Sequence, residues 1–235
     1  MTTLLAFDTA TEYLSVALGA NGRVWVHEGP GGAQASATLI PAVLGLLGEA
    51  GIRLRELDAI AFGRGPGAFT GLRTACSVAQ GLALGAHKPV LPIDSLLAVA
   101  EDARAGAPAL STWVVMDARM NEIYAAHYVF EAGRWCTVVA PMLARAADLN
   151  ERWRNAAPDM VAGTALAAFG EALQPGSARR APQALPRARA MLPLAQALWD
   201  DGGALDAALA LPLYVRDKVA MTTAERSALA AERAA

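Results

Sequence analysis

The feature that most constrains the fold is a pattern that occurs twice along the 235-residue chain. The segment TTLLAFDTATEYLSVAL, which contains Asp8, is restated by STWVVMDARMNEIYAAHYVF, which contains Asp117. In both segments an apolar run typical of a strand ends in the aspartate, and an aliphatic residue, Leu14 or Ile123, follows six positions later. The repeat predicts two copies of one supersecondary unit, and therefore two lobes with the same topology.

The element order expected from the apolar periodicity supports this prediction. The first half reads as three short strands, and the last two meet at Asn21-Gly22, which favours a type I′ hairpin turn. Helices are expected at 36–50 and 71–85, strands at 57–62 and 89–93, and a further helix capped by Asp94 and Ser95. We predict a duplicated two-lobe α/β fold, with an N-terminal lobe at 1–106, a C-terminal lobe at 107–220 and a C-terminal tail at 221–235.

A glycine-rich stretch, AFGRGPGAFTGLR at 61–73, lies between an expected strand and an expected helix, where nucleotide phosphates often bind. A Walker A loop needs a lysine after its last glycine, but Leu72 follows Gly71. The dinucleotide pattern is also poorly matched, because Pro66 lies inside the turn and no acidic residue ends a strand about 20 residues later. We therefore expect 63–71 to form a tight strand-to-helix turn, with Arg64 and Arg73 exposed near the start of the helix.

No catalytic, cofactor or metal site is expected from the sequence. An actin-like ATPase holds phosphates between two hairpins that each carry a glycine after the aspartate, but Thr-Ala-Thr follows Asp8 and Ala-Arg-Met follows Asp117. The two aspartates are either relics of such a site or ordinary residues that cap turns. His27, His87 and His127 lack the spacing of metal ligands.

Charge and cysteine content narrow the class of protein. A formal net charge of -2 gives no basic field, so this chain alone is not expected to bind nucleic acid tightly. The segment 174–190 carries four arginines and no acid, and it is either a solvated loop or a local contact with RNA or an acidic partner.

Cys76 and Cys136 lie in apolar segments and are expected to be buried and unpaired. The N-terminus has no signal-peptide pattern and no apolar run is long enough for a membrane span, so we expect a cytoplasmic protein.

The two helices on either side of the glycine stretch are unusually apolar. Apolar side chains cover most of the helix at 37–50, and the segment 74–86 carries no charge. A helix of this kind is usually buried on two sides, either under a second layer of the same chain or in a subunit interface. The residues expected at such a partner interface are Leu39, Val43, Leu46, Leu47, Arg73, Ala75, Val78, Ala79 and Leu82. Leu46→Glu or Ala79→Arg should then weaken association, whereas unfolding of either variant would place the residue in the core.

Five segments carry a resemblance to a known family: FDTATEYLSVAL, AIAFGRGPGAFTGLRTACSVAQGLALG, PVLPIDSLLAVAE, MDARMNEIYAAHY and LPLYVRDKVA. Together they resemble the TsaB family, also called YeaZ, of bacterial tRNA threonylcarbamoyladenosine synthesis. The resemblance implies an actin-like fold of the ASKHA, RNase H-like type and no transferase activity of its own. It also implies a complex with a paralogous TsaD transferase, a TsaE-like ATPase as a further partner, and a homodimer when TsaD is absent. Ala35 departs from the family, which often has histidine there, and this weakens any metal or protease interpretation.

Two functional hypotheses follow. The first is a non-catalytic scaffold that partners TsaD and is needed for N6-threonylcarbamoyladenosine at position 37 of tRNAs that decode ANN codons, with tRNA met only through the complex. The second is an enzyme, either an actin-like ATPase or a degenerate metallopeptidase. The missing hairpin glycines and clustered histidines favour the first hypothesis.

Overall fold

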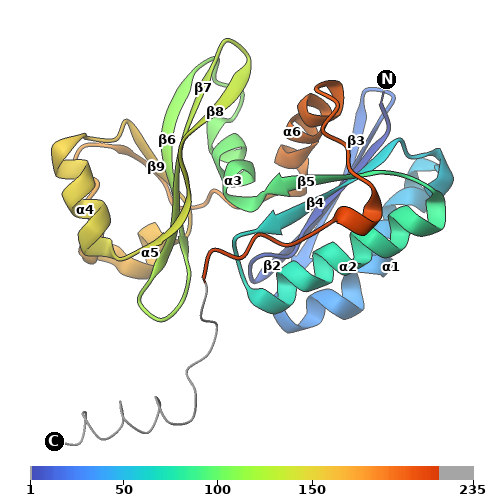
Figure 1. The fold of residues 1–235 in the computed structure, drawn as a ribbon, viewed down its shortest axis with the longest axis horizontal. Helices are drawn as coiled ribbons and strands as arrows, with labels where there is room; N and C mark the ends of the chain where they lie inside the picture. The colour runs from blue at the N-terminus through green and yellow to red at the C-terminus, as the bar shows by residue number, and fades with distance from the viewer. Residues whose placement is uncertain (1, 217–235) are drawn as a thin grey trace, which may run out of the picture.

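The computed structural model describes residues 2–216, which form two lobes side by side (Figure 1). Each lobe contains one five-stranded sheet. The first sheet has the order β3-β2-β1-β4-β5, with β1 (Leu4–Asp8), β2 (Tyr13–Ala20), β3 (Arg23–Pro30), β4 (Ala59–Gly65) and β5 (Val90–Asp94). The second has the order β10-β9-β6-β7-β8, with β6 (Leu110–Asp117), β7 (Ile123–Glu131), β8 (Arg134–Ala144), β9 (Met160–Ala162) and β10 (Arg179–Ala181).

The two sheets have the same topology, as the repeated sequence pattern predicts. In the first sheet, β1, β2 and β3 form an antiparallel meander, and β4 and β5 continue in parallel from β1. In the second, β6, β7 and β8 form the meander, and β9 and β10 continue in parallel from β6. Asp8 and Asp117 end the equivalent strands β1 and β6. The predicted duplicated two-lobe α/β fold is confirmed.

Helices cover both faces of the first sheet, because neighbouring residues of a strand point to opposite sides. Leu5 and Phe7 of β1 belong to the core formed with α1 (Ala35–Ala50) and α2 (Phe69–Ala86). Leu4 and Ala6 belong to the core on the other face, which includes α6 (Ala188–Asp200). α1 and α2 therefore form one outer layer of the molecule, seen at the lower right of Figure 1.

α3 (Ser95–Arg104) packs between the two sheets and joins the lobes. Ala98 belongs to the core of the first sheet with α6, whereas Leu96 and Val99 pack with Val114 and Tyr128 of the second sheet. α4 (Ala146–Asn155) and α5 (Ala165–Phe169) cover the opposite face of the second sheet. Short 3-10 helices lie at 32–34, 54–56, 170–172 and 207–209.

After the second sheet the chain returns to the first lobe. α6 packs on β1 and β2, and its first residue, Ala188, donates its N–H to Ser15 Oγ at 2.8 Å. A side chain of β2 thus accepts a hydrogen bond from one of the N–H groups at the start of α6, which have no partner within the helix. The residues of α6 fall within the predicted C-terminal lobe, 107–220, whereas in space they cover the first sheet. The domain bounds 1–106 and 107–220 stay a prediction.

Several local expectations need correction. Cys76 is buried, but Cys136 is exposed, because it lies on β8 at the edge of the second sheet. The arginine-rich segment is not all a solvated loop: it contains β10 and the start of α6. Its Arg187 pairs with Glu28 at 2.8 Å and with Asp102 at 3.3 Å, and so joins β3, α3 and α6.

Length and composition alone would let one described helical stretch, residues 32–50, span a membrane. Six residues of α1, which makes up most of this stretch, are buried within the chain itself: Ala35, Leu39, Ala42, Val43, Leu46 and Leu47. The apolar composition of α1 therefore has a structural explanation within the first lobe.

Candidate functional site

The nine residues expected at a partner interface do not share one surface. Six of them are at most 4 % exposed and belong to the core between the first sheet and its two helices: Leu39, Val43, Leu46, Leu47, Ala75 and Ala79. Arg73 is exposed, and Val78 and Leu82 lie partly buried at the edge of this core. These six side chains pack against their own sheet. A helix that is apolar all round does not reveal which side faces that sheet. That the helices form an interface stays a prediction.

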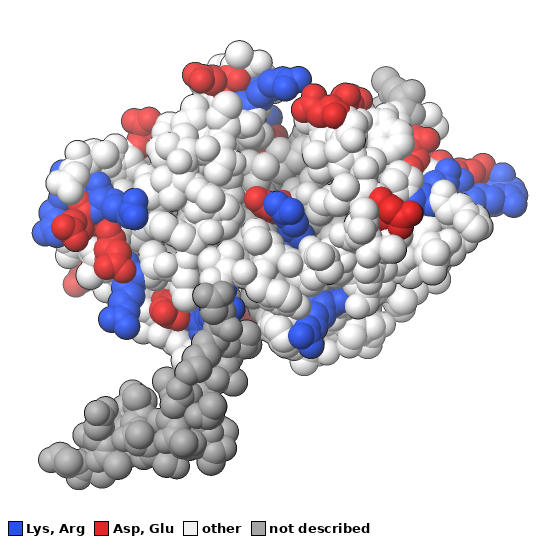
Figure 2. Space-filling model, in the orientation of Figure 1, with Lys and Arg blue, Asp and Glu red and all other residues white. Residues whose placement is uncertain are grey.

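The opposite side of each helix faces solvent and is also apolar. Ile40 and Leu44 of α1 are 43 % and 55 % exposed, and Leu84 of α2 is 72 % exposed. Glu49 is the single charged residue of α1, and Arg73 is that of α2. Figure 2 shows few charged side chains over these helices, at the lower right of the view. We name this surface, formed by the outward sides of α1 and α2, the helical face.

Four glycines lie on the helical face. Gly45 and Gly48 are in α1, Gly81 and Gly85 are in α2, and a Cβ at any of them would meet no atom of the chain within 4 Å. Glycine inside a helix is less favourable than alanine by about 0.5–1 kcal/mol. Nothing in the described chain uses the space that they leave open. A second helix could approach such a surface closely.

The arginines near the start of α2 are both held by protein groups. The Arg73 guanidinium lies 3.8 Å from the ring centre of Phe69, and its Nε donates to the Tyr214 hydroxyl at 3.1 Å. Arg64 pairs with Asp94 at 2.5 Å and is only partly exposed, whereas the sequence predicted an exposed arginine. Asp94 is the residue just before α3, but its side chain makes no capping hydrogen bond and pairs with Arg64 instead.

The glycine-rich stretch forms a tight turn against the β1–β2 hairpin, as predicted. A Cβ on Gly63 would overlap the carboxylate of Asp8, and a Cβ on Gly71 would overlap the carbonyl of Thr9. The Thr9 hydroxyl donates to Gly71 O at 2.7 Å. Ala68, just before α2, donates its N–H to a carbonyl of the same hairpin at 2.8 Å. Protein groups therefore occupy positions that a phosphate would need.

Asp8 is buried at the centre of this arrangement. Its carboxylate accepts hydrogen bonds from the Ser95 hydroxyl at 2.6 Å and from Ala10 N at 2.7 Å. Burial raises the pKa of Asp8 from 3.8 to about 6, and the two hydrogen bonds oppose this effect. The residue that an actin-like ATPase would use at its phosphates is here enclosed by protein.

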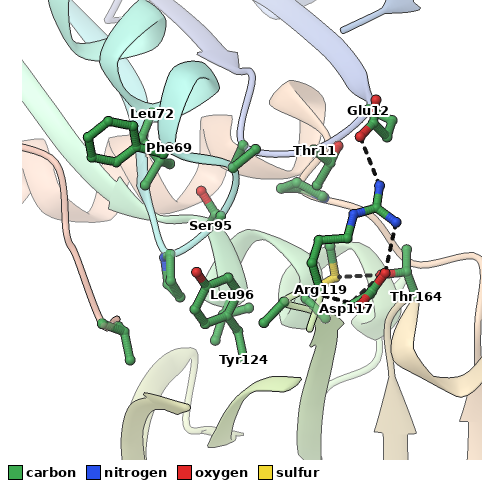
Figure 3. A pocket seen from close by; sticks show the side chains of 18 of the residues that line it. Thr11, Glu12, Phe69, Leu72, Ser95, Leu96, Asp117, Arg119, Tyr124 and Thr164 are labelled. Atoms are coloured by element: carbon green, nitrogen blue, oxygen red, sulfur yellow. Dashed lines mark hydrogen bonds and ion pairs between the residues drawn. The ribbon is translucent and has the colours of Figure 1, made fainter. Parts of the chain in front are cut away.

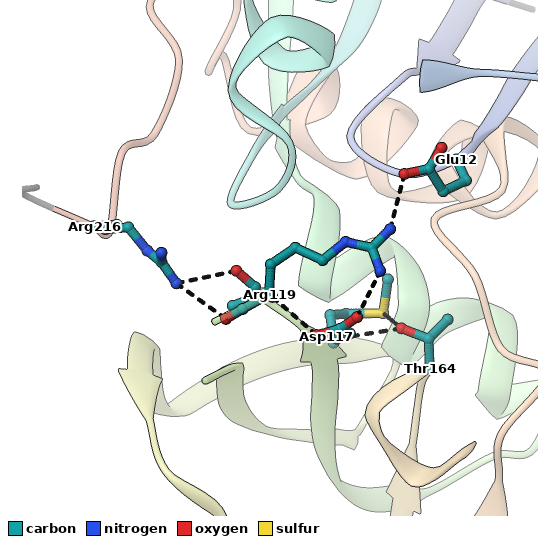
Figure 4. A network of polar contacts seen from close by, with 7 residues as sticks. Glu12, Asp117, Arg119, Thr164 and Arg216 are labelled. Atoms are coloured by element: carbon teal, nitrogen blue, oxygen red, sulfur yellow. Dashed lines mark hydrogen bonds and ion pairs between the residues drawn. The ribbon is translucent and has the colours of Figure 1, made fainter. Parts of the chain in front are cut away.

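Asp117, the second repeat aspartate, lies in the equivalent hairpin of the other lobe. It accepts Arg119 N at 2.8 Å and pairs with the Arg119 guanidinium at 3.1 Å. The same guanidinium reaches Glu12 of the first hairpin at 2.9 Å, so it bridges the two lobes (Figure 4). This ion pair lies between the two hairpins, where an actin-like ATPase holds phosphates.

A cavity of about 340 Å³ lies between the lobes next to this ion pair (Figure 3). Phe69 and Leu72 line it from the first lobe and Tyr124 lines it from the second, so much of its wall is apolar. Within residues 2–216, no three His, Cys, Asp or Glu side chains come together as a metal site would require.

Two features of the cleft were missed in the sequence. The Glu12–Arg119 pair joins residues 107 positions apart, and Arg216 reaches the 118–122 turn from the far end of the described chain. Glu12 and Arg119 both lie within the repeat segments. Aligning the two hairpins would have placed Glu12 and Arg119 close together, but Arg216 has no counterpart in the repeat and left no signal.

Comparisons with known proteins agree on one family. The family model for "TsaD: tRNA N6-adenosine threonylcarbamoyltransferase" matches residues 30–224. The tRNA threonylcarbamoyladenosine biosynthesis protein TsaB of Escherichia coli is 34 % identical, over 92 % of this chain and 96 % of that protein. TsaB of Haemophilus influenzae is 36 % identical, over 92 % and 94 %. The solved structure of YeaZ from Pseudomonas aeruginosa is 38 % identical, with a TM-score of 0.83 over 91 % of this chain and 100 % of that chain.

Proposed function

Because the chain belongs to the TsaB (YeaZ) family of tRNA threonylcarbamoyladenosine biosynthesis proteins, we propose that it is the non-catalytic partner of a TsaD-like transferase. In this role it is required for N6-threonylcarbamoyladenosine at position 37 of tRNAs that decode ANN codons. The match of residues 30–224 to the TsaD model fits the pairing of two paralogues with one fold.

The observation that carries this proposal is the helical face. It combines exposed apolar side chains with four glycines in open space and a single charge on each helix. Burying such a surface against a second pair of helices removes apolar area from water and lets the backbones approach closely. A TsaD-like partner is the occupant we propose, and a second copy of this chain takes its place when that partner is absent.

The cleft supports a role without catalysis. Neither hairpin has a glycine where phosphates would approach, and the Arg119–Glu12 pair lies between the two hairpins. We propose that the chain uses no cofactor and hydrolyses no nucleotide by itself. A TsaE-like ATPase is the further partner, tRNA is met only through the complex, and the complex acts in the cytoplasm.

The test is a reconstituted synthesis of threonylcarbamoyladenosine with a fixed amount of TsaD and TsaE and increasing amounts of this chain. We expect no product without the chain and a plateau near equal amounts of chain and TsaD. Product formation that does not depend on this chain would overturn the proposal.

The helical face is tested by Leu84→Glu in the same assay and in a pull-down with TsaD. Leu84 is exposed, so the variant should keep the circular dichroism spectrum and lose association by about tenfold or more, because a charge would be buried without a partner. The matched control is Val24→Glu, which changes an exposed apolar residue of the edge strand β3. Equal losses for the two variants would show that the helical face is not the contact.

A further inference from the structure

The last described residues form an extended segment that runs from the first lobe to the second. Leu213 donates its N–H to Arg64 O at 2.7 Å, which fixes the segment beside the end of β4. The Tyr214 ring packs on Phe69 with 5.4 Å between ring centres. Residues 213–216 also line the cavity between the lobes. We name residues 213–216 the strap.

Arg216 anchors the strap to the second lobe. Its Nη2 pairs with Glu122 at 2.6 Å and donates to the carbonyl of Ala118 at 3.0 Å (Figure 4 shows the contacts to the 118–119 turn). The side chain of Arg216 is only 12 % exposed. Both Nη atoms of this buried guanidinium contact protein groups, whereas its Nε is buried without a hydrogen-bond partner.

The turn that Arg216 holds is strained. Arg119, Met120 and Asn121 have φ values of 62°, 55° and 59°, so three successive residues with side chains are in the left-handed region. Such a conformation is unfavourable for residues other than glycine, and it persists only where the surrounding structure enforces it. Arg216 bonds this turn through its carbonyls and through Met120 Sδ at 2.8 Å.

The Arg119–Glu12 ion pair between the lobes is much more exposed than the Arg216–Glu122 pair. Arg119 and Glu12 are 69 % and 70 % exposed, so water screens their attraction and their side-chain entropy opposes it. Arg216 is buried and Glu122 is mostly buried, and removal of one partner would leave the other charge without compensation. Arg216 is therefore the stronger of the two connections on this side of the cleft.

We propose that the strap joins the two lobes across the cavity and fixes the angle between them, with Arg216 as its anchor. The first lobe holds residues 213 and 214, and Arg216 holds the strained 118–122 turn, which in turn directs Arg119 to Glu12. Loss of the Arg216 contacts frees the strap and the turn together. This device is independent of the helical face and of any partner.

Hydrogen exchange of the full chain, followed by mass spectrometry or NMR, tests the proposal on Arg216→Met. The informative amides are those of Leu213, Ala118 and Glu122, each of which donates to a backbone carbonyl with the strap in place. We expect these amides to exchange about tenfold faster or more in the variant. Arg180→Met, the same change at an exposed arginine of β10, should leave them unchanged. Unchanged exchange in Arg216→Met, or equal acceleration in the control, would overturn the proposal.

A second measurement addresses the angle between the lobes. Spin labels on exposed Cys136 in the second lobe and on Arg55→Cys in the first give an interlobe distance. We expect Arg216→Met and Glu122→Gln to broaden the distance distribution, and Glu12→Gln to broaden it less, because the Glu12 pair is exposed. A distribution that Arg216→Met leaves as narrow as in the unchanged protein would refute this role of the strap.

Discussion

The carboxyl group of Asp8 has no cationic partner among the described residues and is enclosed by the glycine turn. Its pKa is raised from 3.8 to about 6 by burial. The folded state therefore binds this proton more tightly than the unfolded state, so stability from Asp8 is present below about pH 4 and is lost as the pH rises through about 6. The shift corresponds to roughly 3 kcal/mol.

Asp8→Asn should remove this pH dependence, because an amide does not titrate in this range. Its oxygen can still accept the hydrogen bond from Ala10 N, and its NH2 group can donate to the Ser95 hydroxyl in place of the second carboxylate oxygen. Urea unfolding at pH 4 and pH 8 measures the effect. We expect the free energy of unfolding of the variant, relative to the unchanged protein, to rise by roughly 3 kcal/mol between these two pH values. Asp200→Asn, at the exposed end of α6, is the control. A constant difference between Asp8→Asn and the unchanged protein would contradict the assignment.

Gly71→Ala tests the fit of the glycine turn at a second residue. The new Cβ would overlap the carbonyl of Thr9, which is backbone and cannot move aside easily. We expect the free energy of unfolding to fall by about 1–3 kcal/mol, as for other overpacked sites. Thermal unfolding measures this loss, and an unchanged melting temperature would show that the hairpin and α2 are not packed as described.

At the level of elements, α2 also contains a glycine, Gly81, at which an added Cβ would meet no other atom within 4 Å. Gly81→Ala should therefore stabilise the isolated chain by about 0.5–1 kcal/mol. If a partner helix approaches this position, the same methyl group should weaken association. Thermal unfolding and a titration with TsaD separate the two effects, and improved stability with unchanged association would argue against close approach at Gly81.

The elements also show what the sequence could and could not predict. The strands of the first sheet and the helices α1, α2 and α3 followed from apolar periodicity and turn residues, and the topology of the second sheet followed from the repeat. β10 and the first residues of α6 lie in the segment 174–190, whose prolines and arginines favoured a loop. For the rest of α6 the sequence analysis made no prediction. The exposed side of α1 and α2 could not be chosen from sequence, since apolar residues lie on both sides and only the position of the sheet distinguishes them.

At the scale of the whole molecule, the cleft between the two lobes is the place where an actin-like ATPase would bind ATP, so ATP binding is the property to test. We expect calorimetry to show no micromolar affinity for ATP, either in the unchanged protein or in Arg119→Ala, which removes the ion pair from the cleft. The reason is that the turn N–H group of Ala68 is already bonded to the protein and that both hairpins carry a Cβ where phosphates would approach. Micromolar binding by Arg119→Ala alone would mean that this side chain is the barrier, and binding by both proteins would overturn the non-catalytic assignment.

The whole-molecule arrangement was predictable in outline from the repeat alone. Asp8 and Asp117 marked equivalent strands, and their hairpins do face each other across the cleft. The return of α6 and the strap to the first lobe was not predictable, because the segment after the second repeat has no internal copy to compare. The contacts of Ser15 with Ala188 and of Arg64 with Leu213, which fix this return, join residues far apart in the sequence.

The four glycines of the helical face also affect how fast the protein is degraded in a cell. They lower the intrinsic stability of the lobe. If the proposed partner covers them, its binding restores stability by mass action, and the melting temperature should rise with partner concentration. Molecules made in excess of the partner would spend more time unfolded and would be degraded sooner. Amounts of the two proteins would then be matched by protein turnover, without any need for matched synthesis.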